Sequence, residues 1–251
     1  MNRIEVATVN QKIESGYDFD FGKYITEGFE VFKKEWVLFS LYGLVSMILM
    51  MLSFLTIVGG LFMTFPLLLG YSVAAEKVER GETLEFKDFF GAFKNYNRHF
   101  LLTLCIFIVV FVLYIPFILL FITTSAHSDF GNSPAMGATM GIFMMFYYLF
   151  FYVAIFFVQG SLIFAPYLIH YGGFSTTDAI KSSYKLFKKQ WIMILLFVFV
   201  VGMISSIGYM ACLVGVFATL ACGTLMQYAM VKNILMQTSY SEIDQIGNTG
   251  F

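Results

Sequence analysis

The stretch from residue 36 to residue 75, WVLFSLYGLVSMILMMLSFLTIVGGLFMTFPLLLGYSVAA, decides the fold. It runs for 40 residues without an Asp, Glu, Lys or Arg. The hydrocarbon core of a bilayer is about 30 Å thick, and roughly 20 residues of helix cross it. The stretch is therefore long enough for two transmembrane helices, and we expect the chain to turn between them near Gly59-Gly60.

Three further stretches without charged residues have the same character. Residues 191–231 predict a second hairpin, which turns near residues 209–213. Residues 99–123 and 135–171 predict one span each, and the longer of the two ends at Gly172-Gly173. Together the stretches predict an all-α, polytopic membrane protein with six transmembrane helices.

The composition excludes most other classes of protein. Hydrophobic residues make up 59% of the chain and charged residues 12%, whereas about 25% of residues are charged in ordinary globular proteins. Such a chain cannot cover itself with a water-soluble surface. The net charge of −1 argues against nucleic-acid binding, and three cysteines are too few for a disulfide scaffold.

The basic residues determine the expected orientation, because cytoplasmic segments of membrane proteins are enriched in Lys and Arg. All fifteen lie before the first predicted span, between spans two and three, between spans four and five, or after span six. These segments share one side of the membrane, so we predict that both termini are cytoplasmic. The polar N-terminal residues do not fit a cleavable signal peptide, which would begin with a basic stretch.

An internal repeat organises the chain. A shift of 155 residues aligns Phe32-Lys33-Lys34-Glu35-Trp36 with Phe187-Lys188-Lys189-Gln190-Trp191 without a gap. A weaker third copy lies at a shift of 61, where residues 86–94 align with residues 25–33. Each unit has an even number of spans, so the copies are expected to be parallel repeats. The predicted segments are a cytoplasmic arm, three repeat units and a cytoplasmic tail: residues 1–18, 19–78, 80–171, 174–232 and 233–251.

Each unit begins with an amphipathic segment. Phe21, Ile25, Phe29, Phe32 and Trp36 recur at spacings of three and four, which places them on one face of a helix. We expect these helices to lie in the cytoplasmic interface, with the apolar face in the acyl boundary and the lysines at the headgroups. The alternative is that each is the cytoplasmic end of a long transmembrane helix. In either case the expected interface anchors are Lys33, Lys34, Trp36, Lys188, Lys189 and Trp191.

One stretch before the last predicted hairpin resembles a known family. Its residues are Ala165-Pro166, Gly172-Gly173, Ala179, Ser183 and Leu186, followed by Lys188-Lys189-x-Trp191. The stretch and the six-helix layout resemble the membrane domain associated with bacterial glycerophosphoryl diester phosphodiesterases and related multipass proteins. The resemblance implies a module of the prokaryotic plasma (inner) membrane that accompanies lipid-related or envelope proteins. The phosphodiesterase catalytic domain has no counterpart in this chain, so that activity is not implied.

The sequence offers little for catalysis. None of the predicted spans contains Asp, Glu, Lys or Arg, residues that usually mark function inside a membrane. His99 and His170 stand alone near cytoplasmic boundaries, and the pair His127 and Asp129 lacks the further ligands that zinc requires. The three cysteines behave as small apolar side chains. We therefore predict no enzyme activity, no metal site and no cofactor.

A ridge of small residues is expected to bring helices close together. Small side chains at intervals of four let helix backbones approach closely in lipid. Packing within the chain is one use of such a ridge, and dimerisation is the alternative. The residues are Ala211, Gly215, Thr219 and Gly223 on span six, and Thr56, Gly60 and Thr64 on span two.

The candidate binding residues are Gln159, Gly160, Ser161 and Gln227, which include the strongest amide donors of the apolar region. A glutamine in hydrocarbon must satisfy its amide, so Gln159 is expected to point into the bundle. Gly160 and Ser161 would leave room for a ligand headgroup. The alternative is a structural hydrogen bond between Gln159 and Gln227.

These features predict a non-catalytic integral membrane module with a scaffolding role in the cell envelope. Its expected partners are membrane lipids, a partner membrane protein or a second copy of the chain. The alternative is a transporter or channel for a small neutral or lipidic substrate. Its transport would not be coupled to protons, because the spans lack acidic residues.

Overall fold

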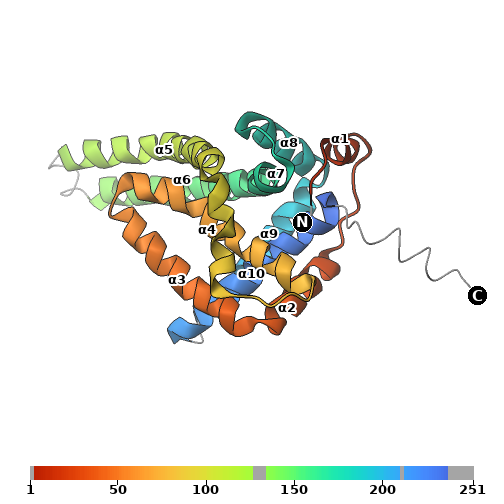
Figure 1. Ribbon diagram of the computed structural model, residues 1–251. Helices are drawn as coiled ribbons and strands as arrows, with labels where there is room; N and C mark the ends of the chain where they lie inside the picture. The colour runs from red at the N-terminus through yellow and green to blue at the C-terminus, as the bar shows by residue number, and fades with distance from the viewer. Residues whose placement is uncertain (1–2, 127–133, 210–211, 237–251) are drawn as a thin grey trace, which may run out of the picture.

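The computed structural model describes residues 3–126, 134–209 and 212–236, and over these residues the protein is all-α, with ten α-helices and one 3₁₀ helix. Figure 1 shows their arrangement. In chain order the elements are α1 (Val6–Ser15), α2 (Phe21–Lys34), α3 (Trp36–Phe54), α4 (Ile57–Glu79), η1 (Phe86–Asn95), α5 (Tyr96–Ala126), α6 (Pro134–Leu162), α7 (Ala165–Gly172), α8 (Thr176–Lys189), α9 (Trp191–Ile207) and α10 (Cys212–Leu235).

Several helices are long and apolar enough to cross a membrane. Within the described residues there are four candidate spans, Trp36–Ser53, Gly59–Glu79, Tyr96–Leu119 and Gly141–Gly172, and a fifth if the bent pair α8 and α9 is counted as one. The sequence predicts six. The difference lies in the last hairpin. α9 has 17 residues, or about 26 Å of helix against a hydrocarbon core of about 30 Å, and counts only together with α8, while α10 is not among the candidate spans.

A corner with a non-helical residue separates α2 from α3 and α8 from α9. The axes of α8 and α9 differ by 98°, which excludes one continuous helix there. The corner residue Gln190 has φ −136° and ψ 38°, and its N–H donates to Phe187 O. Glu35, between α2 and α3, has φ −136° and ψ 40° and donates to Phe32 O. The two corners therefore have the same backbone geometry.

The N-termini of the two amphipathic helices are capped in the same way. The Asp20 carboxylate accepts from the Lys23 backbone N–H, and the Ser175 hydroxyl accepts from the Asp178 backbone N–H. Each bond satisfies an N–H group that the helix itself leaves unpaired. Two lysines close the last turn of each helix, where positive charge is favourable.

The amphipathic helices pack on protein along part of their surface. The buried residues of α2 are Tyr24, Gly28 and Val31, and the helix lies against α10. In the same way η1 lies against α4, and α8 against α6 and α7. On the predicted face of α2, Phe21, Ile25 and Phe32 pack in part against the core, whereas Phe29 and Trp36 are 45% and 58% exposed. Contact of the exposed part with the acyl boundary stays a prediction.

The core lies at the end of the molecule where these short helices gather. Its fully buried side chains include Tyr42, Phe89, Tyr167 and Tyr228. By contrast, 11% of the candidate span in α5 and none of the span in α6 is buried. In Figure 1 one end of the α5–α6 pair lies beside α7 and α8, and the two helices project to the left from there, away from α2 and α10. The opposite halves of the hairpins are therefore exposed to their surroundings.

One predicted boundary differs from the structure and another agrees with it. The first hairpin turns at Leu55-Thr56, and Gly59-Gly60 lies inside α4. A pair of glycines tolerates a helical backbone when it is buried in an apolar context, so it does not by itself enforce a turn. The other long stretch has a break after Leu162, yet it counts as one candidate span, Gly141–Gly172, and its end agrees with the prediction. Gly173, which follows α7, has φ 66°. That left-handed conformation favours glycine.

The N-terminal segment, predicted as a cytoplasmic arm, packs onto the protein as α1. Val9 is fully buried, and the helix lies against α8. The Tyr17 hydroxyl donates to Leu186 O at 2.9 Å, and burial raises the pKa of this phenol. The segment therefore packs on α8 and also contacts α10.

Candidate functional site

An open groove lies between α6, α9 and α10. Its volume is about 610 Å³. Its walls are mostly apolar, and the polar groups come from two glutamines and two serines. The lining residues are Phe156, Gln159, Val198, Phe199, Val201, Gly202, Met203, Ser205, Ser206, Ile207 and Gln227. This polar groove is the candidate functional site.

The groove brings together the two glutamines that the sequence singles out. Gln159 belongs to α6 and Gln227 to α10, and both line the groove. Gln159 is exposed, rather than enclosed in the bundle as expected, and Gln227 is half-buried. Among the described residues neither amide has a hydrogen-bond partner, so the predicted bond between them is not formed. Both amides are free to bind a ligand.

Gly160 and Ser161 serve the packing of α8 instead of the groove. A Cβ on Gly160 would lie 2.8 Å from Leu195 Cδ2 and 3.2 Å from Phe187 Cε2. The Ser161 carbonyl accepts a hydrogen bond from the Ser183 hydroxyl at 2.7 Å. The space that was expected to hold a ligand headgroup is therefore filled by side chains of α8 and α9.

The small residues of α10 face α9. Thr219 Oγ1 donates to Ser205 O at 2.8 Å, and a Cβ on Gly223 would lie 2.2 Å from Ser205 Oγ. A Cβ on Gly208 would lie 2.5 Å from Gly215 O. These contacts are within one chain, as a packing ridge requires. Ala211 lies outside the described residues.

The corresponding residues of α4 play a more local role. Thr56 precedes the first residue of α4, and its hydroxyl donates to Ser53 O at 3.2 Å. Thr64 Oγ1 donates to Gly60 O of its own helix at 2.6 Å. The α4 side of the predicted ridge therefore bonds within the first hairpin.

We expect Thr219→Leu to destabilise the protein by about 1–3 kcal/mol, the usual cost of overpacking. The larger side chain would enter the contact between α10 and the backbone of α9 and would lose the hydrogen bond to Ser205. The melting temperature in mild detergent measures the effect. Leu220→Ala is the control, because Leu220 is 41% exposed. Equal losses in the two variants would mean that Thr219 is not on the packed face.

The predicted interface anchors lie at the two corners. Trp36 and Trp191 are 58% and 48% exposed. The Lys33 ammonium is 2.6 Å from the Glu30 carboxylate, and the Lys189 ammonium donates to Glu14 O. Lys34 and Lys188 are exposed. Both indoles are therefore available to the membrane interface.

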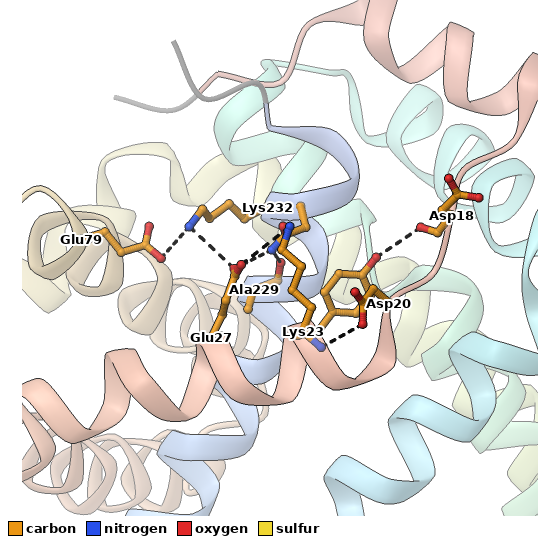
Figure 2. Close-up of polar contacts among 9 residues, drawn as sticks. Asp18, Asp20, Lys23, Glu27, Glu79, Ala229 and Lys232 are labelled. Carbon is orange, nitrogen blue, oxygen red and sulfur yellow. Dashed lines mark hydrogen bonds and ion pairs between the residues drawn. The ribbon is translucent and has the colours of Figure 1, made fainter. Parts of the chain in front are cut away.

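Lys232, Glu27 and Glu79 form an ion cluster that joins α2, α4 and α10 (Figure 2). The cluster is not among the predictions from the sequence. The Lys232 ammonium lies 2.8 Å from the Glu79 carboxylate and 4.0 Å from the Glu27 carboxylate. The Asn233 amide donates to Glu27 Oε2 at 2.6 Å. The cluster fixes α2 to the end of α10.

A second ion pair occupies the equivalent position between α4 and η1. The Lys77 ammonium is 2.9 Å from the Asp88 carboxylate. Burial alone would raise the pKa of Asp88, but the hydrogen bonds from Lys77 and from the Glu85 N–H outweigh it and lower the pKa. The two lysines are separated by 155 residues, and the acids Glu27 and Asp88 by 61. The repeat shifts were therefore the signal that would have predicted both pairs.

A second cavity, of about 850 Å³, lies beside this ion pair. Its charged residues are paired with one another, as Arg80 is with Glu76 at 3.1 Å. His170 also lines it, and the rings of His99 and His170, solitary in the sequence, lie 5.9 Å apart. No group of three potential metal ligands occurs in the described part of the chain, and His127 and Asp129 lie outside it.

Comparison with known proteins does not assign the chain to a family. The chain matches no family model, no curated protein and no solved structure. The resemblance to the membrane domain of glycerophosphoryl diester phosphodiesterases therefore rests on the sequence alone. What the structure establishes is an all-α chain with several apolar helices, typical of a multi-pass membrane protein.

Proposed function

We propose that the protein is a non-catalytic membrane module that binds a lipid in the polar groove and scaffolds other proteins of the cell envelope. The observation that carries the proposal is the pair Gln159 and Gln227. Two helices far apart in the sequence bring unpartnered amides to one groove whose walls are otherwise mostly apolar. An amide exposed to hydrocarbon is costly unless it finds a hydrogen-bond partner.

The shape of the groove supports a lipidic ligand. Along α9 the lining runs from Val198 to Ile207, which is about 14 Å of helix. Phe199, Met203 and Ile207 are each more than half exposed. An acyl chain that lay parallel to α9 would therefore contact an apolar surface along its length. The amides offer two donors and one acceptor each to a neutral polar headgroup.

The proposal includes three parallel repeat units and six membrane-crossing helices. In its support, the bounds of α2 and α8 differ by 155 residues at both ends, and α3 and α9 begin 155 residues apart, as do α4 and α10. Each amphipathic helix packs on the last helix of another unit, η1 on α4, α8 on α6 and α7, and α2 on α10. Three such contacts would close the units into a ring.

The proposed location is the plasma (inner) membrane of a prokaryote, with both termini in the cytoplasm. The support is the distribution of Lys and Arg, which by the positive-inside rule places the amphipathic helices on the cytoplasmic side. The core then lies at the cytoplasmic end of the bundle, and the exposed halves of the hairpins face lipid.

The test replaces Gln159 or Gln227 by Leu in the full chain. Because neither amide bonds to the protein, we expect little change in melting temperature. Loss of one hydrogen bond should weaken lipid binding about five- to tenfold. Native mass spectrometry from mild detergent measures the fraction of protein that retains a co-purified lipid.

Thr224→Val is the matched control, since it removes a polar group from α10 that bonds to its own helix at Leu220 O. Equal retention of lipid by the wild type and both glutamine variants would refute lipid binding in the groove. Flux of a neutral substrate in proteoliposomes that depends on Gln159 would assign the groove to transport instead.

A further inference from the structure

The exposed face of α8 differs from those of the other two amphipathic helices. Lys181, Lys185 and Lys188 are exposed, and their spacings of four and three place them on one helix face. Tyr184 lies on the same face and is 51% exposed. We call the three lysines the basic face.

The lysines of the basic face have no partner in the protein. Among the described residues none of the three makes an ion pair or a side-chain hydrogen bond. The acid of α8, Asp178, accepts from the Ser175 hydroxyl at 2.6 Å at the start of the helix. The face therefore carries three uncompensated positive charges.

On α2 and η1, Lys23, Lys33 and Lys87 each lie beside an acid. The Lys23 ammonium is 3.9 Å from Glu27, and Lys33 is 2.6 Å from Glu30. Lys87 is 2.5 Å from Glu85. At the repeat shift of 155, Lys185 replaces the acid Glu30. The excess of positive charge is thus a property of α8.

The packing of α8 sets the direction of the basic face. The opposite face contacts the flank of α6, where Phe187 lies 5.0 Å from the ring of Phe157 and Ser183 bonds to Ser161 O. The lysines therefore lie on the side of α8 that is turned away from α6. Trp191 follows Lys188 at the corner and is 48% exposed, and tryptophan favours the level of the headgroups.

We propose that the basic face of α8 binds the headgroups of anionic phospholipids in the surrounding bilayer. Each basic residue near an anionic membrane surface contributes about 1 kcal/mol, a factor of about five in affinity. Nucleic acid or an acidic protein would also suit three lysines, but the exposed indole of Trp191 beside them favours lipid headgroups. The site is separate from the polar groove and does not depend on it.

The two tryptophans provide a test within one protein, because they occupy equivalent corners. The Trp36→Phe variant reports from Trp191, beside the basic face, and the Trp191→Phe variant reports from Trp36. Each is reconstituted in phosphatidylcholine vesicles that contain brominated phosphatidylglycerol or brominated phosphatidylcholine, whose bromines quench a neighbouring indole. Quenching of Trp191 should report an apparent affinity for the anionic lipid that exceeds the affinity for the neutral lipid about fivefold or more at low salt. We call this quotient, anionic over neutral, the ratio at that tryptophan. The ratio at Trp36 should be close to one.

Charge variants identify the cause. Replacing Lys181, Lys185 and Lys188 by Gln should bring the ratio at Trp191 close to one, and replacing them by Arg should preserve it. The control replaces Lys12, Lys23 and Lys87 by Gln, which removes the same charge elsewhere and should leave the ratio unchanged.

Three results would overturn the proposal. They are equal ratios at the two corners, a ratio at Trp191 that survives the glutamine variant, and a ratio that falls as much in the control. Binding of an oligonucleotide or acidic peptide, together with equal quenching by both lipids, would assign the face to a macromolecule.

Discussion

Gly28→Ala is expected to destabilise the protein by about 1–3 kcal/mol or more, the cost of forcing an extra methyl group into the packed interface between α2 and α10. The Cβ would lie 2.5 Å from Met226 Cα and 2.6 Å from Met226 N. Both are backbone atoms, so a rotamer change cannot relieve the contact and α2 must move away from α10. The melting temperature in detergent should fall clearly.

Gly22→Ala on the same helix is the matched control. There the nearest atom to the new Cβ is Asp20 Oδ1 at 3.9 Å. Within a helix Ala is favoured over Gly by about 1 kcal/mol, so this variant should be neutral or stabilised. If Gly28→Ala melted no lower than Gly22→Ala, the close packing of α2 on α10 would be disproved.

Gly70 offers an independent check at the contact between α4 and η1. A Cβ at this position would lie 2.4 Å from Phe89 O. Its substitution should have an effect of similar size, since η1 meets α4 as α2 meets α10. This glycine therefore tests the same packing rule in a different pair of helices.

The second large effect is expected for Lys232→Met. Removal of one partner from a buried ion pair costs about 3–5 kcal/mol. The side chains of Lys232 and Glu79 are each 21% exposed, so we expect a smaller loss of about 2–3 kcal/mol. The cause is repulsion between the carboxylates of Glu27 and Glu79, which the ammonium separates in Figure 2.

The double variant Lys232→Met/Glu79→Gln separates this cause from lost packing. Neutralising Glu79 should restore part of the stability that the single variant loses, which a thermodynamic cycle measures. Lys33→Gln is the control, because Lys33 and Glu30 are about half exposed and such pairs contribute about 0–1 kcal/mol. No recovery in the double variant would mean that repulsion is not what destabilises Lys232→Met.

The sequence by itself determined the class of the protein and much of its helix register. Long charge-free stretches are a local property, and they predict apolar helices wherever the chain goes. The match of Phe32-Lys33-Lys34 with Phe187-Lys188-Lys189 likewise predicted that two amphipathic helices end in the same way. A capping residue, a terminal pair of lysines and an apolar period are all encoded within a few residues.

Only the tertiary structure decided what the helix faces meet. The sequence predicts that the apolar faces of α2 and α8 meet lipid, and in the structure both helices pack in part on protein. An apolar stripe carries no information about which apolar surface covers it. Gln159 and Gln227 were selected as amides in hydrocarbon, yet their place in one groove, without a mutual bond, depends on how three helices pack. The hydrophobic effect favours burial of an apolar face but does not specify the surface that buries it. A periodic sequence therefore predicts that a face is buried, and the packing of distant parts of the chain determines which surface covers it.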